Sequence, residues 1–371
     1  MHESAVGTNA KYSDGPLFGR YRGVTGHGAG ITERPNLSRF SGCGVNGMCT
    51  SSRCLASGLI LASALVCGSA TEAAEKVVVG VTGPPNALGW PFEIAIEKGF
   101  FAAAGITIDR VAAPSSAAVV LQATAGALDM TVQGAFVDVI RAIDQGAALA
   151  IVRIMVQTPP YELLAKPSIK SLKELKGKII SIGGQKDVTH VYLNRMLEPN
   201  GLKDSDVDLV YAGASSARLA ALESGAVDAA MLTSPYNFNA VNDGFPVIGR
   251  TADYITDLPQ NGTVVNRNWA VGHMDTVRRF LVAFHKGFDW FMDRRNRDEA
   301  INILVAVGKL KPEEVAKSYD FFRNGEFFEP TGNVSKRKLL TVTKVLESLG
   351  DLPSNIDLDK LFLPGVTKVV D

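Results

Sequence analysis

Residues 76–111 read KVVVGVTGPPNALGWPFEIAIEKGFFAAAGITIDRV and contain the signals for a strand, a helix and a second strand in succession. The run at 76–81 is continuous and rich in valine, which is typical of a buried strand. Gly-Pro-Pro-Asn at 83–86 predicts a turn, and apolar side chains on one face predict a helix over 91–101. A second strand is predicted over 106–111. This order predicts a βαβ unit in a mainly parallel sheet.

A second copy of this pattern follows later in the chain. After the first unit the sequence predicts a helix over 115–125 and a strand over 128–132. The matching segments are KVVV at 76–79 with KIIS at 178–181, SSA at 115–117 with SSA at 215–217, and GALD at 126–129 with GAVD at 225–228. Either common α/β elements match by chance, or the chain holds two lobes of like topology with a cleft between them. The second interpretation predicts two α/β lobes.

The pattern changes after about residue 250. A strand is predicted over 261–265 and a long helix over 275–294, whose aromatic stripe indicates core packing. Pro312 fits the first turn of another helix, and Ser335 fits the cap of a helix that runs to Leu349. We expect these C-terminal helices to pack on the first lobe. The predicted division is therefore 75–160 plus 251–371 for lobe 1 and 161–250 for lobe 2.

Composition limits the class of protein. The chain has 371 residues, more than one ordinary domain, with 38 Lys and Arg against 38 Asp and Glu. This balance argues against a nucleic-acid partner, which needs a basic surface. The cysteines, Cys43, Cys49, Cys54 and Cys67, all precede residue 70, so the body offers no disulfide, no cysteine-ligated metal and no thiol nucleophile. We expect a monomer without a cofactor.

The segment 48–74 resembles a secretory leader in its order of features. Arg53 precedes an uncharged apolar stretch at 55–66, and small residues follow where a signal peptidase cleaves. The apolar stretch is too short to span a bilayer, so we predict export to the periplasm without stable membrane insertion. Anchoring by a lipid on Cys67 is an alternative, although Val66 is bulky for the position before a modified cysteine.

Residues 1–47 are rich in Gly, Ser and Arg and lack apolar periodicity. A secretory signal begins near its own start, so Met48 rather than Met1 is the expected first residue of the natural protein. The alternative is a disordered N-terminal tail.

Candidate ligand contacts follow from where the strands end. In open α/β sheets, ligands bind beyond the carboxyl ends of the strands, where helix N-termini favour anions. The loops at these positions give as ligand-binding candidates Asn86, Trp90, Ser115, Ser116, Gln133, Gly134, Tyr161, Gly184, Gln185, Asp187, Ser215, Ser234 and Tyr236. Trp90, Tyr161 and Tyr236 offer aromatic faces for stacking. Residues 158–161 are expected to form a crossing between the lobes.

Several of these candidates have a structural alternative. Ser115, Ser215 and Asp187 are also good helix N-caps, whose side chains bind their own backbone. Gly183-Gly184 fits a plain tight turn, and Trp90 fits a core position. We assign no catalytic or metal site, because His190, His273 and His285 lie in no recognised catalytic or metal-binding spacing, and no nucleophile elbow or phosphate loop is present.

Four motifs resemble those of a known family. EKGFF at 97–101 leading to Gly105-Ile106, GALD at 126–129, LKELKGK at 172–178 and LESGAVDAA at 222–230 are similar to signatures of periplasmic binding proteins of the nitrate/sulfonate/taurine type. The resemblance covers about residues 76–294. It implies a type II periplasmic-binding-protein fold, with two doubly wound α/β lobes around a ligand cleft. It also implies a small-molecule ligand, delivered to an ABC permease with its ATPase.

The resemblance leaves the ligand and one alternative class open. Helix N-termini facing the cleft favour a small organic anion, aliphatic or aromatic, such as a sulfonate or a carboxylate. The family also contains a branch that binds or makes thiamine pyrimidine precursors, and its enzymes carry a cysteine cluster that this body lacks. We therefore expect a binding protein and no enzyme. A sensory ligand-binding subunit or a thiamine-pyrimidine-related enzyme is the alternative.

Overall fold

The computed structural model describes residues 74–353 and 356–371. The predictions for residues 1–47 and, apart from Ala74, for the leader at 48–74 lie outside this part. No helix in the described ranges is long and apolar enough to cross a lipid bilayer.

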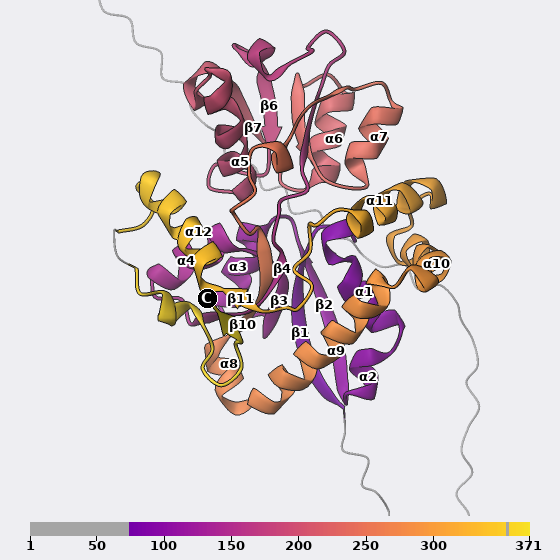
Figure 1. The fold of residues 1–371 in the computed structure, drawn as a ribbon, viewed down its shortest axis with the longest axis vertical. Helices are drawn as coiled ribbons and strands as arrows, with labels where there is room; N and C mark the ends of the chain where they lie inside the picture. Colours follow the sequence, from indigo (N-terminus) through magenta and orange to yellow (C-terminus); the bar gives the residue numbers. More distant parts are fainter. Residues whose placement is uncertain (1–73, 354–355) are drawn as a thin grey trace, which may run out of the picture. The chain divides into compact units, whose positions relative to one another are not determined.

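The first of two five-stranded sheets has the order β2-β1-β3-β10-β4 (Figure 1). Its strands are β1 (Glu75–Thr82), β2 (Ile106–Ala113), β3 (Met130–Ala135), β4 (Leu149–Val156) and β10 (Asn261–Asn266). Strands β2, β1 and β3 run parallel, whereas β10 is antiparallel to both of its neighbours. The predicted strands at 76–81, 106–111 and 261–265 are thus confirmed. The strand predicted over 128–132 is also present as β3, but it begins at Met130 rather than at residue 128.

The second sheet repeats this order as β7-β6-β8-β5-β9. Its strands are β5 (Glu162–Ala165), β6 (Ile179–Ile182), β7 (Asp208–Tyr211), β8 (Ala229–Leu232) and β9 (Val247–Arg250). Again three strands run parallel, and the fourth, β5, is antiparallel to its neighbours. The two sheets are the cores of two α/β lobes, which confirms the predicted fold class.

The sequence repeat has a structural cause. Asp129 and Asp228 end the matching GALD and GAVD motifs, and each accepts a hydrogen bond from the backbone of the neighbouring parallel strand, β1 or β6. Asp129 Oδ2 lies 2.7 Å from the nitrogen of Val78, and Asp228 Oδ2 lies 3.0 Å from that of Ile179. The turn before β3 is therefore hydrogen-bonded to β1, and the turn before β8 is hydrogen-bonded to β6 in the same way.

Helices cover both sheets. The first lobe carries α1 (Trp90–Glu97), α2 (Phe100–Ala103), α3 (Ser116–Thr124) and α4 (Phe136–Asp144), and the second carries α5 (Val188–Leu197), α6 (Ser215–Glu223) and α7 (Tyr236–Asn242). The helix predicted over 91–101 is wrong in one respect, because it is interrupted between Glu97 and Phe100. Gly99 adopts φ +71° there, a left-handed conformation that ends α1.

The C-terminal part consists of α8 (Arg267–Gly272), α9 (Met274–Met292), α10 (Arg297–Gly308), α11 (Pro312–Asn324) and α12 (Lys336–Ser348), with a short pair β11 (Val334–Ser335) and β12 (Val369–Val370). The aromatic stripe of α9 is buried as predicted, and Phe284 packs edge-on against Phe92 of α1 at 5.7 Å. Helices α9 and α10 pack on α1, and α12 packs on α4. Helix α11 also contacts α7 of the second lobe, where Phe321 meets Phe238 edge-on.

Two segments cross between the sheets, 157–161 after β4 and 251–260 after β9. Thr251 ties them together, because its hydroxyl donates to the carbonyl oxygen of Pro159 at 2.5 Å and its backbone nitrogen donates to that of Tyr161 at 2.9 Å. We propose that the lobe boundaries lie in these crossings, with 75–160 and 251–371 in lobe 1 and 161–250 in lobe 2.

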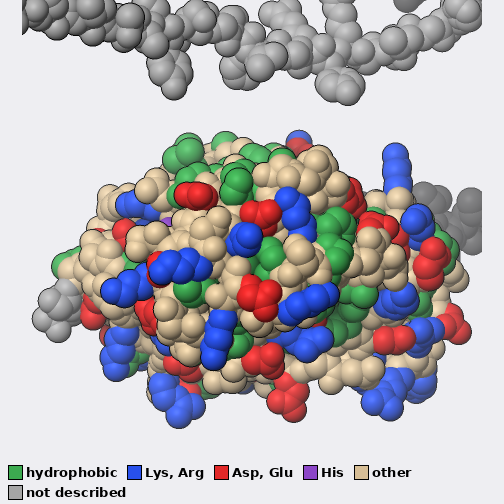
Figure 2. Space-filling model, turned by 90° about the horizontal axis from the view of Figure 1, so that it is seen from above, with side chains coloured by type: hydrophobic (Ala, Val, Ile, Leu, Met, Phe, Trp, Pro, Cys, Tyr) green, Lys and Arg blue, Asp and Glu red, His purple; other side chains and the backbone are tan. Residues whose placement is uncertain are grey.

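The outer surface carries both signs of charge. Figure 2 shows Lys and Arg side chains interspersed with Asp and Glu over one face, with apolar patches between them. On this face the overall charge balance of the sequence therefore also holds locally.

Candidate functional site

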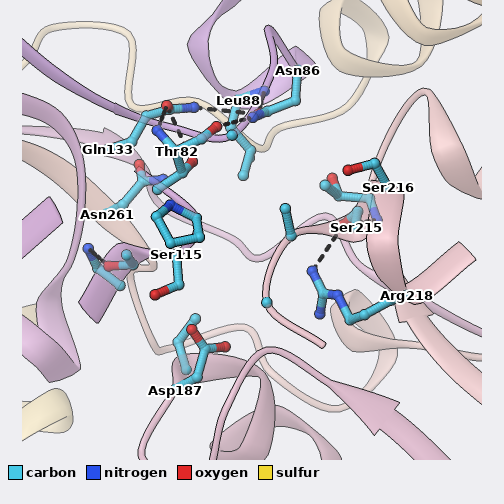
Figure 3. A pocket seen from close by; sticks show the side chains of 18 of the residues that line it. Thr82, Asn86, Leu88, Ser115, Gln133, Asp187, Ser215, Ser216, Arg218 and Asn261 are labelled. Carbon is cyan, nitrogen blue, oxygen red and sulfur yellow. Dashed lines mark hydrogen bonds between the residues drawn. The ribbon is translucent and has the colours of Figure 1, made fainter. Parts of the chain in front are cut away.

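A small cavity lies where the two lobes meet, and both lobes line it (Figure 3). It holds about 60 Å³ of space that the centre of a water molecule can reach. The cavity in this closed conformation therefore suits a small molecule.

Eight of the predicted site residues line this cavity: Asn86, Ser115, Ser116, Gln133, Tyr161, Asp187, Ser215 and Tyr236. They come from the loops and helix starts that follow the strands in both lobes, where the topology led us to expect them. We therefore propose that these residues contact the ligand.

Amide side chains form the first-lobe wall. Gln133 on β3 accepts from the backbone nitrogen of Thr82 at 2.7 Å and donates to Asn86 Oδ1 at 3.2 Å. Asn86 in turn donates to the carbonyl oxygen of Thr82 at 3.0 Å. These bonds join the ends of β1 and β3 and fix the orientation of both amides before a ligand arrives.

Two serines at the start of α3 use their lone pairs within the protein. Ser115 caps the helix, because its Oγ accepts from the backbone nitrogen of Ala118 at 3.2 Å, so the N-cap interpretation is confirmed for this residue. Ser116 Oγ accepts from the backbone nitrogen of Ala135 at 2.8 Å. A hydroxyl that accepts keeps its own proton to donate, so Ser115 can still serve a ligand acceptor, whereas the Ser116 hydroxyl is a hydrogen-bond partner of the Asp138 carboxyl group.

Arg218 on α6 is the main feature of the second-lobe wall. Its side chain points toward the cavity (Figure 3), and the residue is only 3% exposed. Nη2 donates to Ser215 Oγ at 2.8 Å, whereas Nε and Nη1 are buried without a hydrogen-bond partner in the described protein. A buried guanidinium stays charged, and leaving its N–H groups unpaired is costly. The site therefore presents two unused donors to an incoming acceptor.

Ser215 differs from its counterpart Ser115. It lies within the first turn of α6 rather than at the N-cap, and Ala214 caps that helix without a side-chain bond. The Ser215 hydroxyl instead accepts from Arg218 and from the backbone nitrogen of Thr233, which is 3.3 Å away. The N-cap alternative is thus wrong for Ser215, whose role is to hold the guanidinium.

Asp187 begins α5 and faces the same cavity. Its Oδ1 accepts from the backbone nitrogen of Thr189 at 2.9 Å and from the hydroxyl of Thr189 at 2.5 Å, so the N-cap interpretation is confirmed. The residue is 8% exposed and also lines the cavity. One carboxylate therefore caps a helix and faces the ligand space at once.

Asp138 on α4 lies near Asp187 from the other lobe. Burial, and after it the negative charge of Asp187, raise the pKa of Asp138 from 3.8 to about 7, against the opposing effects of Ser116 and Arg141. Two carboxylates facing each other in a dry environment cannot both ionise at low cost. The pair therefore makes the approach of the lobes sensitive to protonation.

Tyr161 lies in the first crossing and borders both charged groups. Its ring centre is 5.7 Å from the guanidinium carbon of Arg218, and its hydroxyl accepts from Gln260 Nε2 at 3.2 Å. Burial raises the pKa of Tyr161, while Arg218 lowers it and Asp187 raises it. The uncharged phenol of Tyr161 therefore lines the cavity with an aromatic ring.

Five predicted contacts lie outside the cavity lining. Trp90 is fully buried in the first-lobe core, so it offers no stacking face, and its core alternative holds. Gly134 packs beneath Val139 and Val264. Gly184 and Gln185 lie in the loop before α5, where the Gln185 carbonyl oxygen contacts His190 Nδ1 at 2.5 Å. Ser234 is buried, and its carbonyl oxygen accepts from the backbone nitrogen of Ala87 at 3.3 Å, a bond between the lobes.

The sequence reasoning missed several lining residues, chiefly Thr82, Arg218, Thr233, Gln260 and Asn261. Arg218 lies one turn after Ser215 in SSARLAALE, and its position on the same helix face was the available signal. Gln260 and Asn261 close the second crossing, and only the return of β10 into the first sheet brings them to the cavity.

A contact network closes the lobes beside the cavity. Arg141 of α4 donates to the backbone oxygen of Lys186 in the second lobe at 2.5 Å. The same guanidinium pairs with Asp351 at 2.6 Å, and Lys186 lies 3.4 Å from that carboxylate. These contacts span the lobes and stabilise the closed arrangement.

Two like-ordered sheets, two crossings and a polar cavity between the lobes define a protein of the periplasmic-binding-protein fold. The family model described as NMT1/THI5 like matches residues 89–297, more than half of the chain. The chain belongs to this family.

Among curated proteins, the formylaminopyrimidine-binding protein of Halalkalibacterium halodurans is 28% identical over 247 residues, covering 63% of this chain and 71% of that protein. Solved structures share the fold. The alkanesulfonate-binding protein SsuA from Xanthomonas axonopodis pv. citri, bound to MOPS, has a TM-score of 0.65 at 18% identity, covering 80% of this chain and 98% of its own. The nitrate-binding protein NrtA from Synechocystis PCC 6803 has 0.66 at 15% identity, covering 77% and 86%.

The fold also serves catalysis in another protein. The desulfurization enzyme DSZB has a TM-score of 0.58 at 16% identity, covering 79% of this chain and 97% of its own. Binding proteins and an enzyme thus share this architecture, so the site must decide between the two.

Proposed function

We propose that this protein is the exported solute-binding component of an ABC importer, which closes its two lobes on a small polar molecule and delivers it to a permease with its ATPase. It acts in the periplasm as a monomer and converts nothing. The observation that carries this proposal is the buried guanidinium of Arg218, whose Nε and Nη1 have no partner in the closed cavity of the described protein.

The cost of burial explains why an unpaired guanidinium points to a ligand. Breaking a buried ion pair by removing one partner costs about 3–5 kcal/mol, because one charge is left uncompensated. A ligand group that pairs with Arg218 removes this cost only when the lobes are closed. Ligand binding and lobe closure are therefore coupled, as transport requires.

The proposal can be tested on protein purified from its own cells. Native mass spectrometry is expected to show one small molecule bound per chain, released on denaturation and chemically unchanged after long incubation. Removing it is expected to increase the radius of gyration in solution scattering, because the lobes separate. Arg218→Met is expected to lose the bound molecule, whereas Lys173→Met on the surface keeps it.

Three outcomes would contradict the proposal. Conversion of the bound molecule would identify an enzyme on this fold. Absence of any bound molecule, with no thermal shift on a panel of sulfonates, carboxylates, nitrate and pyrimidines, would leave the fold without this function. A partner protein that binds only the ligand-loaded form, in place of a permease, would instead identify a sensory subunit.

A further inference from the structure

The lining of the cavity carries one charge of each sign. Among its described lining residues, Arg218 and Asp187 are the charged ones, and they are 3% and 8% exposed. Both side chains make hydrogen bonds elsewhere in the described structure, from Arg218 Nη2 to the Ser215 hydroxyl and from Thr189 to Asp187 Oδ1. Each charge therefore faces the shared space without neutralising the other directly.

Hydrogen-bonding groups divide in the same way. Arg218 offers the donors Nε and Nη1, which are buried and unpartnered in the described structure. On the opposite side of the cavity in Figure 3, Asn261 offers Oδ1, and the neighbouring Gln260 offers Oε1; both acceptors are buried without a donor from the described residues. Asp187 adds its carboxylate to the acceptors, with Oδ1 already held by Thr189. The cavity thus calls for a ligand that carries both an acceptor group for Arg218 and N–H donors for these acceptors.

From this division we infer that the solute is a small molecule of net charge zero that carries an acceptor group for Arg218 and an amino or other N–H group for Asp187 and Asn261. The inference rests on the proposed function and narrows its ligand. A plain organic anion satisfies Arg218 but brings its negative charge into a small dry space beside Asp187. Buried charges favour the ligand whose charges complement both of them.

Size and shape add to this description. The space of about 60 Å³ for water centres leaves room for a short molecule, and the ring of Tyr161 borders it near both charges. Short zwitterions fit this description, and so do aminated heterocycles whose ring nitrogen is the acceptor. These two sources share one chemistry, an acceptor and an N–H donor in one small neutral molecule.

Matched ligand pairs test the inference by isothermal titration on the full chain freed of bound solute. The pairs are taurine with ethanesulfonate, β-alanine with propionate, and 4-amino-2-methylpyrimidine with 2-methylpyrimidine. The amino-bearing member of at least one pair is expected to bind at least about tenfold more tightly than its partner. The first two pairs report a zwitterion and the third reports an aminated heterocycle.

Two variants assign the preference to residues. Asp187→Asn keeps an acceptor for the α5 cap, because asparagine caps as well as aspartate, but removes the negative charge. It is expected to lower the selectivity for the amino-bearing member about tenfold or more. Arg218→Gln is expected to weaken the binding of every member of the sulfonate pair and of the carboxylate pair. Its melting temperature is expected to stay within a few degrees of that of the parent protein.

The failure of this inference is distinct from that of the proposed function. If ethanesulfonate or propionate binds the parent protein as tightly as its amino analogue, the inference is overturned while a solute-binding role stands. The same holds if the solute found in the purified protein lacks an N–H donor. If none of the six probes binds, the inferred ligand class is wrong, and the role itself is then judged by whether any solute is co-purified.

Discussion

Replacing Asp138 with asparagine removes a carboxyl group that the folded protein keeps protonated over an unusual range of pH. Burial, and then the facing charge of Asp187, raise the pKa of Asp138 from 3.8 to about 7. The folded state therefore holds a proton that the unfolded chain has already lost. The favourable contribution of this group is fully present below pH 3.8 and is lost as the pH rises toward 7.

The size of the effect follows from the two pKa values. One pKa unit corresponds to 1.36 kcal/mol, so the full loss is about 4 kcal/mol, of which about 2–3 kcal/mol falls between pH 5 and pH 8. Asparagine does not titrate, so the Asp138→Asn variant escapes this loss. Relative to the parent protein, the variant is expected to gain about 2–3 kcal/mol in free energy of unfolding between pH 5 and pH 8.

Urea denaturation of both proteins at the two pH values measures this difference. Asp144→Asn is the matched control, because Asp144 lies exposed at the end of the same helix. For the control, the difference from the parent in free energy of unfolding is expected to change by less than about 0.5 kcal/mol between pH 5 and pH 8. The reasoning about the carboxylate pair would be refuted if the free energy of unfolding of Asp138→Asn, relative to the parent, stayed constant or fell between pH 5 and pH 8.

Two further predictions concern the closed arrangement and the first sheet. Arg141→Met loses the charge-assisted bond to the Lys186 backbone, worth about 1.5–3 kcal/mol. We expect about tenfold weaker binding of the co-purified solute by titration and a larger radius of gyration, and unchanged affinity would argue against this contact as a clasp. Gly262→Ala places a Cβ 1.9 Å from the backbone oxygen of Arg153, so β10 must move, and we expect a loss of at least about 3 kcal/mol in urea denaturation. Gly272→Ala, with no atom within 4 Å of its Cβ, is the control, and equal stability of the two variants would contradict the prediction.

Local patterns were enough to predict most of the fold. Short β-rich runs predicted β1, β2, β3 and β10, and the repeat pointed to β6, whereas no strand was predicted at β4, β5 or β9. Ser335 and Pro312 marked the helix starts that the structure shows. The break at Gly99 was missed, because the apolar side chains keep their helical spacing across it. Such a spacing reports which face is buried and carries no information on a single left-handed residue.

The site was less accessible to sequence reasoning. Topology placed the loops correctly, but whether a side chain turns to the core or to the cavity depends on its neighbours. Trp90 is the first residue of α1, and it is buried in the core on which α1 and α9 pack. Arg218 is buried, with its guanidinium against Ser215 and the ring of Tyr161. From sequence alone an arginine is expected to be exposed to solvent. Tertiary contacts of this kind are absent from any local window of sequence.

Strand β10 fills the place between β3 and β4, yet the whole second sheet lies between β4 and β10 in the chain. As the polypeptide is synthesised, the first sheet therefore keeps an empty slot until the residues of β10 emerge. The second lobe is contiguous and has all its strands available earlier. The order of synthesis thus delays completion of the first lobe until every strand of the second lobe has been made.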